Sequence, residues 1–335
     1  MKSLSPEAVW HMADKDLSDV LCHEPSGFGS RKIRFYAPSF MYYKTAYSRS
    51  SPTNFPTVSV TGSYCALNCA HCGGTVLKTM YPATTPEELL RLCRKLKLRG
   101  ALGCLISGGC LPNGSVPLAS FIDAIQRVKR DTGLMVLVHT GLIDFETAKA
   151  LRESGVDTAL IDVIASDDTI REVCRMDATA QDYARSLEAL NEAKLNFVPH
   201  VIVGLDHGRL NGELRALKMI SQHRPSALVI IAFMPIRGTP MQNVEPPKPI
   251  DIARVILAAR LIFNRKPVVL GCMRPKGNHR KETDLLAIRA GVDAIAFPAE
   301  EAIDYATNNG YTVSFSSLCC SQVYLDAEKL LGYAT

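Results

Sequence analysis

From residue 57 onward, short apolar runs alternate with helical patterns, and this alternation limits the folds open to the chain. Strand–helix alternation is typical of parallel sheets, and eight such units form an α/β barrel. We therefore predict an α/β fold, a (β/α)8 TIM-type barrel with an N-terminal helical and loop extension and a short C-terminal tail. The predicted strands are 57–61, 101–107, 134–139, 158–164, 197–203, 227–233, 267–271 and 293–297. The predicted helices are 85–97, 117–133, 144–154, 167–173, 179–193, 209–222, 250–264, 279–290 and 299–309.

The chain has 335 residues with 47% hydrophobic content, enough for one large core. We expect an N-terminal extension over 1–54, a barrel over 55–310 and a C-terminal tail over 311–335. In the extension, a capping serine followed by proline predicts a helix at 5–20. The aromatic and basic stretch 31–50 has two interpretations, a lid or collar over a cavity and a loop packed on the barrel rim.

The charge pattern argues against nucleic-acid binding, because the net charge is only +5 and no block of five like charges occurs. The first 20 residues carry no apolar signal-peptide segment, and no apolar run reaches about 18 residues. We therefore expect neither secretion nor a membrane span. Eleven cysteines in such a chain indicate a reducing cytoplasm, where thiolates serve metal centres.

Three cysteines follow the first predicted strand, Cys65, Cys69 and Cys72, with C-x3-C-x2-C spacing. Three thiolates on one short loop suit three corners of a cubane [4Fe–4S] cluster and leave one iron open to a small molecule. Zinc usually takes four ligands, and common ferredoxin motifs carry four cysteines. The alternative interpretation is a zinc loop or three unrelated buried thiols.

The loops after the strands of such a barrel share one face, where barrel enzymes have their active sites. Glycines and polar residues gather at these predicted strand ends, and glycine lets a backbone approach a ligand closely. Taken alone, each glycine also fits a plain turn, and each polar residue fits an ordinary packed or ion-paired position. The rim histidines His139, His200 and His207 receive no role.

The cysteine motif resembles the signature of radical S-adenosylmethionine (SAM) enzymes. This resemblance implies a [4Fe–4S] cluster on Cys65, Cys69 and Cys72, with SAM bound to the open iron. Electron transfer into the sulfonium then yields methionine and a 5′-deoxyadenosyl radical. We assign no catalytic side chain beyond the cluster and SAM.

Resemblance to biotin synthase-like members implies the contacts with SAM. Gly108-Gly109-Cys110 stands where these enzymes usually carry Gly-Gly-Glu for the amino group, and Cys110 leaves that contact to backbone carbonyls or another acid. Asp162 is implied for the ribose hydroxyls and Arg175 for the carboxylate, which a guanidinium group matches bidentately. Pro235 lies in a proline-rich segment implied to meet adenine. The implied SAM-binding residues are Gly108, Gly109, Gly141, Asp162, Arg175 and Pro235.

Three further cysteines suggest a second cluster. Cys272 follows the seventh predicted strand, and Cys319 and Cys320 follow an alternating stretch at 311–315. A strand at 311–315 would return this pair to the active face. We hypothesise a second [4Fe–4S] cluster on these three cysteines with an unidentified fourth ligand. The alternative is apolar burial of the cysteines and a frayed tail.

Several segments together resemble the two-protein lipoyl synthases of archaea and some bacteria. The resemblance implies sulfur insertion at C6 and C8 of a protein-bound octanoyl chain, where the adenosyl radical removes hydrogen and the second cluster donates sulfur. It also implies two partners, an octanoylated lipoyl domain or carrier protein and a second radical SAM protein as partner subunit. The segments are 33–38, 58–74, 82–86, 138–141, 271–275 and 319–320.

Two other classes of function remain open. One is a biotin synthase-like mutase, lyase or other sulfur-inserting enzyme without a sacrificial cluster. The number of iron atoms per chain would distinguish this class from a lipoyl synthase with two clusters. The other is a non-catalytic cluster carrier or scaffold, which cleavage of SAM would exclude.

Overall fold

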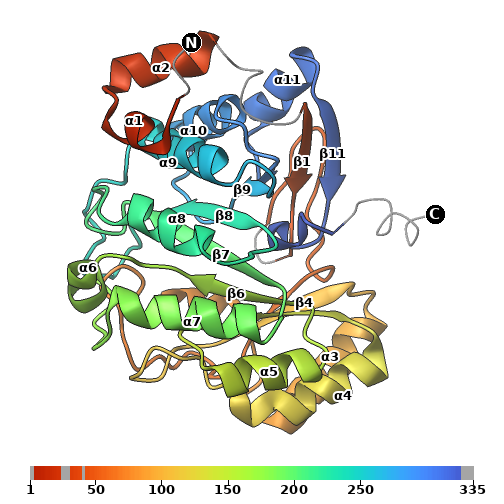
Figure 1. Cartoon of the computed structure of the whole chain (residues 1–335). Helices are drawn as coiled ribbons and strands as arrows, with labels where there is room; N and C mark the ends of the chain where they lie inside the picture. Colours follow the sequence, from red (N-terminus) through yellow and green to blue (C-terminus); the bar gives the residue numbers. More distant parts are fainter. Residues whose placement is uncertain (1–3, 24–30, 40–41, 326–335) are drawn as a thin grey trace.

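The computed structural model describes residues 4–23, 31–39 and 42–325. Eight parallel strands lie side by side in one curled sheet, in chain order, and each falls inside a predicted strand (Figure 1). The prediction of a TIM-type α/β fold is therefore confirmed. These strands are β2 (Thr57–Ser59), β4 (Gly103–Ser107), β5 (Met135–His139), β6 (Thr158–Asp162), β7 (Phe197–Val203), β8 (Leu228–Ala232), β9 (Val268–Leu270) and β10 (Ala294–Ala296).

Helices follow these strands and cover the outer side of the sheet (Figure 1). The first of them begins with a capping box, in which Thr85 accepts from the Glu88 backbone N–H and the Glu88 carboxylate accepts from the Thr85 N–H. The helices are α3 (Pro86–Leu98), α4 (Ile122–Thr132), α5 (Phe145–Glu153), α6 (Asp167–Glu172), α7 (Ala180–Glu192), α8 (Glu213–Ser221), α9 (Pro249–Ile262), α10 (Asn278–Arg289) and α11 (Glu300–Asn308). Short 3-10 turns are η1 (Thr75–Thr79), η2 (Ala119–Phe121) and η3 (Cys320–Gln322).

Three more strands extend the sheet to eleven. The two-residue β3 (Tyr81–Pro82) pairs with β2, whereas β1 (Lys32–Tyr36) pairs with β10 and β11 (Thr312–Ser316) pairs with β1, all in parallel. Among the described residues no pairing joins β11 to β3, so the sheet is a half-barrel whose hydrogen-bonded ladder does not close. The carboxyl end of β11 lies on the same face as those of the barrel strands, as predicted for 311–315.

The stretch 31–50 contains a strand, which neither of its two interpretations included. The chain after this strand packs on the barrel rim, where Tyr43 lies against the Phe297 ring and donates a 3.0 Å hydrogen bond to the Pro298 carbonyl. Rim packing is therefore the better description of 42–50. Phe40, an aromatic residue of the same stretch, lies outside the described residues.

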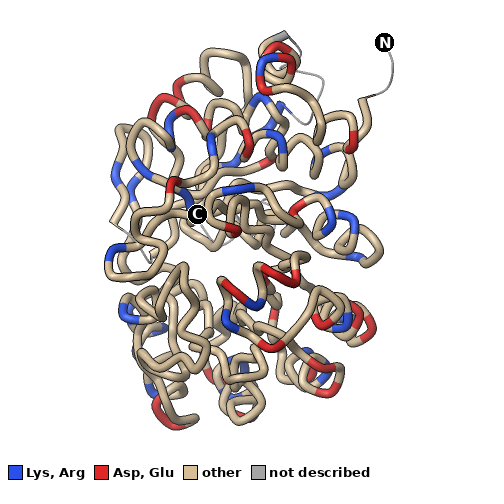
Figure 2. The backbone as a smooth tube through the Cα atoms, turned by 90° about the vertical axis from the view of Figure 1, so that its left-hand side faces the viewer, with Lys and Arg blue, Asp and Glu red and all other residues tan. Residues whose placement is uncertain are grey.

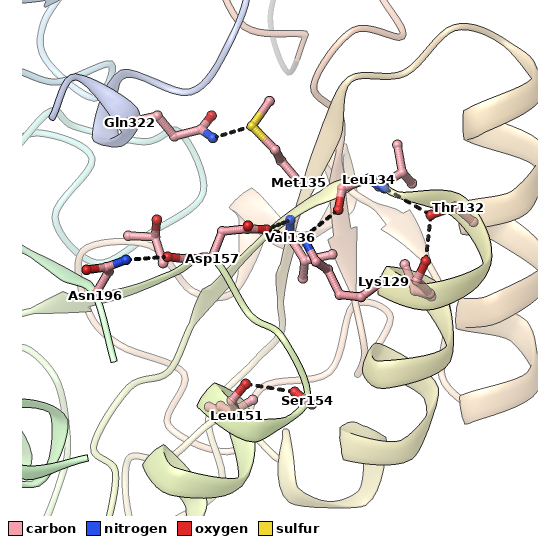
Figure 3. A network of polar contacts seen from close by, with 12 residues as sticks. Lys129, Thr132, Leu134, Met135, Val136, Leu151, Ser154, Asp157, Asn196 and Gln322 are labelled. Carbon is pink, nitrogen blue, oxygen red and sulfur yellow. Dashed lines mark hydrogen bonds and ion pairs between the residues drawn. The ribbon is translucent and has the colours of Figure 1, made fainter. Parts of the chain in front are cut away.

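The chain after β11 enters the interior of the curled sheet. Leu318 and Cys320 are buried there among inward-facing strand residues, and two further contacts reach the amino ends of β5 and β6. The Gln322 amide donates to the Met135 sulfur at 3.1 Å, as Figure 3 shows beside the Lys129–Asp157 ion pair. The Tyr324 hydroxyl lies 2.6 Å from the Thr158 hydroxyl. The segment that contains Cys319 and Cys320 is therefore held in the interior of the curled sheet by burial and by these two side-chain contacts.

The predicted helix at 5–20 is two helices, α1 (Pro6–His11) and α2 (Asp14–His23), which pack beside α9. The chain becomes extended at Met12. The buried Arg254 guanidinium explains the break, because it donates to the Val9 and Met12 carbonyls at 2.8 and 2.6 Å and to Asp14 at 2.7 Å. Those carbonyls therefore do not need helical partners.

Charged positions lie mainly on the loops and outer helices, where both signs are interspersed (Figure 2). In the parts of the chain that the structure describes, every helix is too short or too polar to cross a bilayer.

Candidate metal centre

The cysteine loop follows β2 at the carboxyl face of the sheet. One ligand atom from each of Cys69, His71 and Cys72 lies within 4.8 Å of the other two. The Cys65 thiol is close enough to influence the pKa of Cys69. The buried Nδ1 atom of His71 has no partner among the described residues. Three thiols gathered on one loop are soft donors, and they fit a [4Fe–4S] cluster.

Two distant segments hold this loop by backbone hydrogen bonds. On one side the Ala66 N–H donates to the Cys110 carbonyl at 2.9 Å. On the other side the Ala70 N–H donates to the Val173 carbonyl at 2.7 Å, and Arg175 donates to the Asn68 carbonyl at 3.0 Å. The predicted SAM-carboxylate residue Arg175 therefore lies at the cysteine loop.

Gly109 touches the cysteine loop so closely that no side chain would fit. A Cβ atom there would lie 2.0 Å from the Tyr64 carbonyl oxygen and 2.6 Å from the Cys65 Cα, far inside contact distance. The Gly109 N–H donates to the Thr61 hydroxyl at 2.7 Å, and Gly108 packs against the same residue. The close approach expected of Gly108 and Gly109 is thus made, in this structure, to the loop itself.

Asp162 ends β6 within a group of three histidines. Its carboxylate lies 3.5 Å from His139 Nε2, and the rings of His139 and His200 are 6.0 Å apart. Burial alone would raise the pKa of Asp162, but the charges of His139, His200 and His71 outweigh burial and lower it to about 2. An ionised carboxylate with a partly exposed edge can accept hydrogen bonds from ribose hydroxyls.

Pro235 and Gly141 have different surroundings. The turn that begins at Pro235 reaches the cysteine loop, because a Cβ atom on Gly73 would lie 3.7 Å from the Thr239 methyl group. Gly141 has a positive φ and instead meets the Gly114 carbonyl, 2.2 Å from the position of its missing Cβ. Its neighbours Thr140 and Leu142 line a cavity of about 800 Å³ between the loops after β4 and β5 and α7, to which no predicted cluster ligand contributes.

The structure also gathers Cys272, Cys319 and Cys320. Cys272 follows β9, and Cys319 and Cys320 lie beside it in the barrel interior. Burial raises the pKa of Cys272 to about 12, with a smaller contribution from Cys319. Interaction with Cys320 lowers the pKa of Cys319 to about 7, and the charge of His139 contributes to the same shift. The second group therefore faces the same interior as Asp162 and its histidines.

The sequence interpretation did not place two thiols at the cysteine loop: it noted Cys110 only as a departure from Gly-Gly-Glu and did not consider Cys174. Interaction with Cys110 outweighs burial and lowers the pKa of Cys65 to about 5. Cys174 is in hydrogen-bond contact with Cys69, whose sulfur also donates to the Cys174 carbonyl at 3.2 Å. Both lie beside residues already singled out, Gly109 and Arg175, and that adjacency was the available signal.

Comparison with known proteins agrees with this geometry. Residues 59–208 match the Radical SAM superfamily. The biotin synthase of Leptospira biflexa is 26% identical over 226 residues, which cover 64% of this chain and 62% of that protein. The matched region thus spans less than two thirds of that relative.

Two solved structures share the fold. The [FeFe]-hydrogenase maturase HydG has a TM-score of 0.65 and 16% identity, with 100% of this chain and 77% of HydG covered. Methylornithine synthase PylB has a TM-score of 0.59 and 15% identity, with 88% and 82% covered.

Residues 59–208 therefore form a domain of the radical SAM superfamily. The relatives that match the chain over this region and beyond it are biotin synthases, so its similarity within the superfamily is to biotin synthase. A radical SAM protein carries a [4Fe–4S] cluster and binds SAM, and the thiols of Cys65, Cys69 and Cys72 fit that cluster.

A buried carboxyl group beneath the loop after β7 leads to a testable pH dependence. Glu213 begins α8, and its Oε1 atom accepts from the Gly204 N–H at 2.9 Å. Its buried Oε2 atom has no partner among the described residues. Burial raises the pKa of Glu213 from 4.5 to about 7.

We expect the free energy of unfolding to fall as the pH rises from about 4.5 to about 7, because over this range the unfolded chain releases a proton that the folded chain keeps. Glu213→Gln should abolish this dependence and be the more stable protein at about pH 8, by roughly 3 kcal/mol at most. Urea unfolding over a pH series measures the difference. The exposed Glu192, changed to Gln, is the control, and an equal pH dependence for wild type and Glu213→Gln would contradict the argument.

Proposed function

We propose that this protein is a radical SAM sulfurtransferase of the lipoyl synthase type, which inserts sulfur into an octanoyl chain carried by another protein. The observation that carries the proposal is the second group of thiols. Cys272 follows the barrel strand β9, and Cys319 and Cys320 come from the segment after β11, yet all three pack in or against one buried cluster of the barrel interior. Sulfur insertion needs a sulfur source beside the SAM site, and a second [4Fe–4S] cluster on these thiols would be that source.

Cys65, Cys69 and Cys72 would hold the first cluster, which when bound would supply the electron for cleavage of SAM. The chain's own residues then bind and orient SAM. The Arg175 guanidinium lies at the cysteine loop, where it can pair with the SAM carboxylate. Asp162, ionised because of its histidine neighbours, can accept hydrogen bonds from the ribose. The turn after Pro235 adjoins the same loop and offers backbone groups to adenine.

The protein interior around the two sets of cysteines, the cysteine loop and the set of Cys272, Cys319 and Cys320, suits radical chemistry. His139 lies 3.5 Å from the Asp162 carboxylate, and its charge also contributes to the lowered pKa of Cys319. The interior of the sheet around Cys320 is apolar and filled by side chains from the barrel strands. Such an interior excludes water and limits a reactive radical to a target held in contact with it.

The proposal includes partners and a setting. The substrate protein is an octanoylated lipoyl domain or carrier protein, and a second radical SAM protein inserts the other sulfur atom. A reducing cytoplasm fits the many cysteines, all of which are unpaired by disulfides in the described residues.

A direct test is anaerobic incubation of the protein with SAM, a strong reductant, an octanoylated lipoyl-domain peptide and the candidate partner protein. Mass spectrometry should show a gain of sulfur on the peptide together with 5′-deoxyadenosine. Cleavage of SAM without a gain of sulfur would favour a mutase or lyase. No SAM cleavage at all would favour a cluster carrier.

Iron content tests the second cluster separately. Wild-type protein reconstituted anaerobically should hold about eight iron atoms per chain, and the double variant Cys319→Ala/Cys320→Ala should hold about four. The control is Cys22→Ser, an exposed cysteine outside the barrel interior, which should leave the count unchanged. About four iron atoms in the wild type, unchanged in the double variant, would end the idea of a second cluster.

A further inference from the structure

Five thiols surround the first cluster site, two more than a three-cysteine cluster needs. Cys110 lies against Cys65, because its carbonyl accepts from the Ala66 N–H at 2.9 Å and Gly109 packs on the Cys65 backbone. Cys174 lies against Cys69, whose sulfur is 3.2 Å from the Cys174 carbonyl oxygen. The two extra cysteines come from opposite sides of the loop, one from the end of β4 and the other from the turn after α6. Cys93 on α3 and Cys104 on β4 form another buried pair of thiols that is not part of this site. This pair serves as a matched control.

The two contacts are built into the backbone. Cys110 is fixed by the bond from the Ala66 N–H to its carbonyl and by the close packing of Gly109 on Cys65. Cys174 is fixed by its own N–H, which donates to the Thr169 carbonyl at 3.2 Å, and by the bond between Ala70 and Val173. These bonds hold the backbones of Cys110 and Cys174 beside the cysteine loop, so each thiol is attached within reach of a predicted cluster ligand.

Ligation to iron changes what each sulfur can do. A cysteine that binds iron is a thiolate, so it has no proton to donate and can only accept hydrogen bonds. Cys69 then loses its bond to the Cys174 carbonyl, and the Cys174 thiol is the neighbouring donor. In the same way, Cys65 becomes the acceptor of the Cys110 thiol.

We propose that Cys110 and Cys174 donate S–H hydrogen bonds to the cluster sulfurs of Cys65 and Cys69 and thereby raise the reduction potential of the SAM-cleaving cluster. Hydrogen bonds to ligand sulfurs are among the factors that set the potentials of iron–sulfur clusters, because they stabilise the more negative reduced state. Cys110 stands at the position where an acid usually follows Gly-Gly. Because Cys110 lies against Cys65, its thiol is placed to donate to that ligand sulfur. The inference depends on the family assignment of the first cluster and not on the octanoyl substrate.

The test is a redox titration of the cluster, followed by electron paramagnetic resonance, in full-length protein without SAM or substrate. The Cys319→Ala/Cys320→Ala background isolates the first cluster. Cys110→Ala and Cys174→Ala should each shift the midpoint potential to a more negative value, and the double variant should show the sum of the two shifts. Iron content should stay at about four atoms per chain.

Serine variants separate hydrogen bonding from packing. Cys110→Ser and Cys174→Ser keep a donor of similar size, so they should recover most of the potential lost in the alanine variants. Cys93→Ala, which removes one thiol of the matched pair, should leave the potential unchanged. Alanine variants with the potential of the Cys93→Ala control would overturn the proposal. A loss of iron in either alanine variant would also overturn it, since that thiol would then be a ligand.

Discussion

Replacement of Cys69 by alanine is expected to abolish cleavage of SAM and to remove the first cluster. Cys69 is buried, and its sulfur lies in the tight group that also contains Cys72 and His71. Two remaining thiolates cannot hold a cubane that already leaves one iron open, so about four iron atoms per chain should be lost. Iron analysis, the visible absorbance of the cluster and the yield of 5′-deoxyadenosine measure this result.

The matched control for this change is Cys93→Ala. Cys93 is also buried and also lies beside another thiol, but it is on α3, away from the cysteine loop. This variant should retain its iron and its SAM cleavage. Near-normal iron in Cys69→Ala would contradict the assignment of the loop.

His71 separates an iron–sulfur loop from a zinc loop. A zinc ion bound by the group Cys69, His71 and Cys72 would be lost in His71→Ala, because zinc would use the imidazole nitrogen as a ligand. A cluster held by three thiolates should remain in that variant. Purified wild-type protein that contains zinc in place of iron, and loses it in His71→Ala, would refute the cluster assignment.

Much of the barrel could be predicted because its strands are short apolar runs buried on both faces. Strand β1 could not, although Ile33 and Phe35 are buried and Lys32 and Arg34 are more exposed, the alternation of a strand. The aromatic residues that follow hid this pattern, and the strand forms by pairing with β10 and β11, about 260 and 280 residues away in the chain. Such pairing is set by tertiary structure rather than by local sequence.

The same difference separates the predicted and the missed parts of the site. Cys65, Cys69 and Cys72 could be assigned because their spacing is local. The contact between Cys69 and Cys174 joins residues 105 positions apart, so no spacing rule reveals it. The histidines around Asp162 come from different strands and meet only because parallel strands end at one face of the sheet.

Arg274→Met is expected to cost about 3–5 kcal/mol of the free energy of unfolding. Arg274 and Asp284 are completely buried and paired through two hydrogen bonds of 2.8 and 2.9 Å. The guanidinium also donates to the carbonyls of Gly271, Ala296 and Phe297, so it joins the ends of β9 and β10 to α10. Methionine fills a similar volume but leaves the Asp284 carboxylate and those carbonyls without these donors.

Urea unfolding under anaerobic conditions, followed by circular dichroism, measures this cost. The exposed pair of Arg94 and Asp131 provides the control, because Arg94→Met should cost no more than about 1 kcal/mol. Arg274→Met combined with Asp284→Asn should recover part of the loss, since the second change removes the unpaired buried charge. Equal costs for Arg274→Met and Arg94→Met would mean that water reaches Asp284 in the folded protein, and the buried pair would then not be what holds the ends of β9 and β10 together.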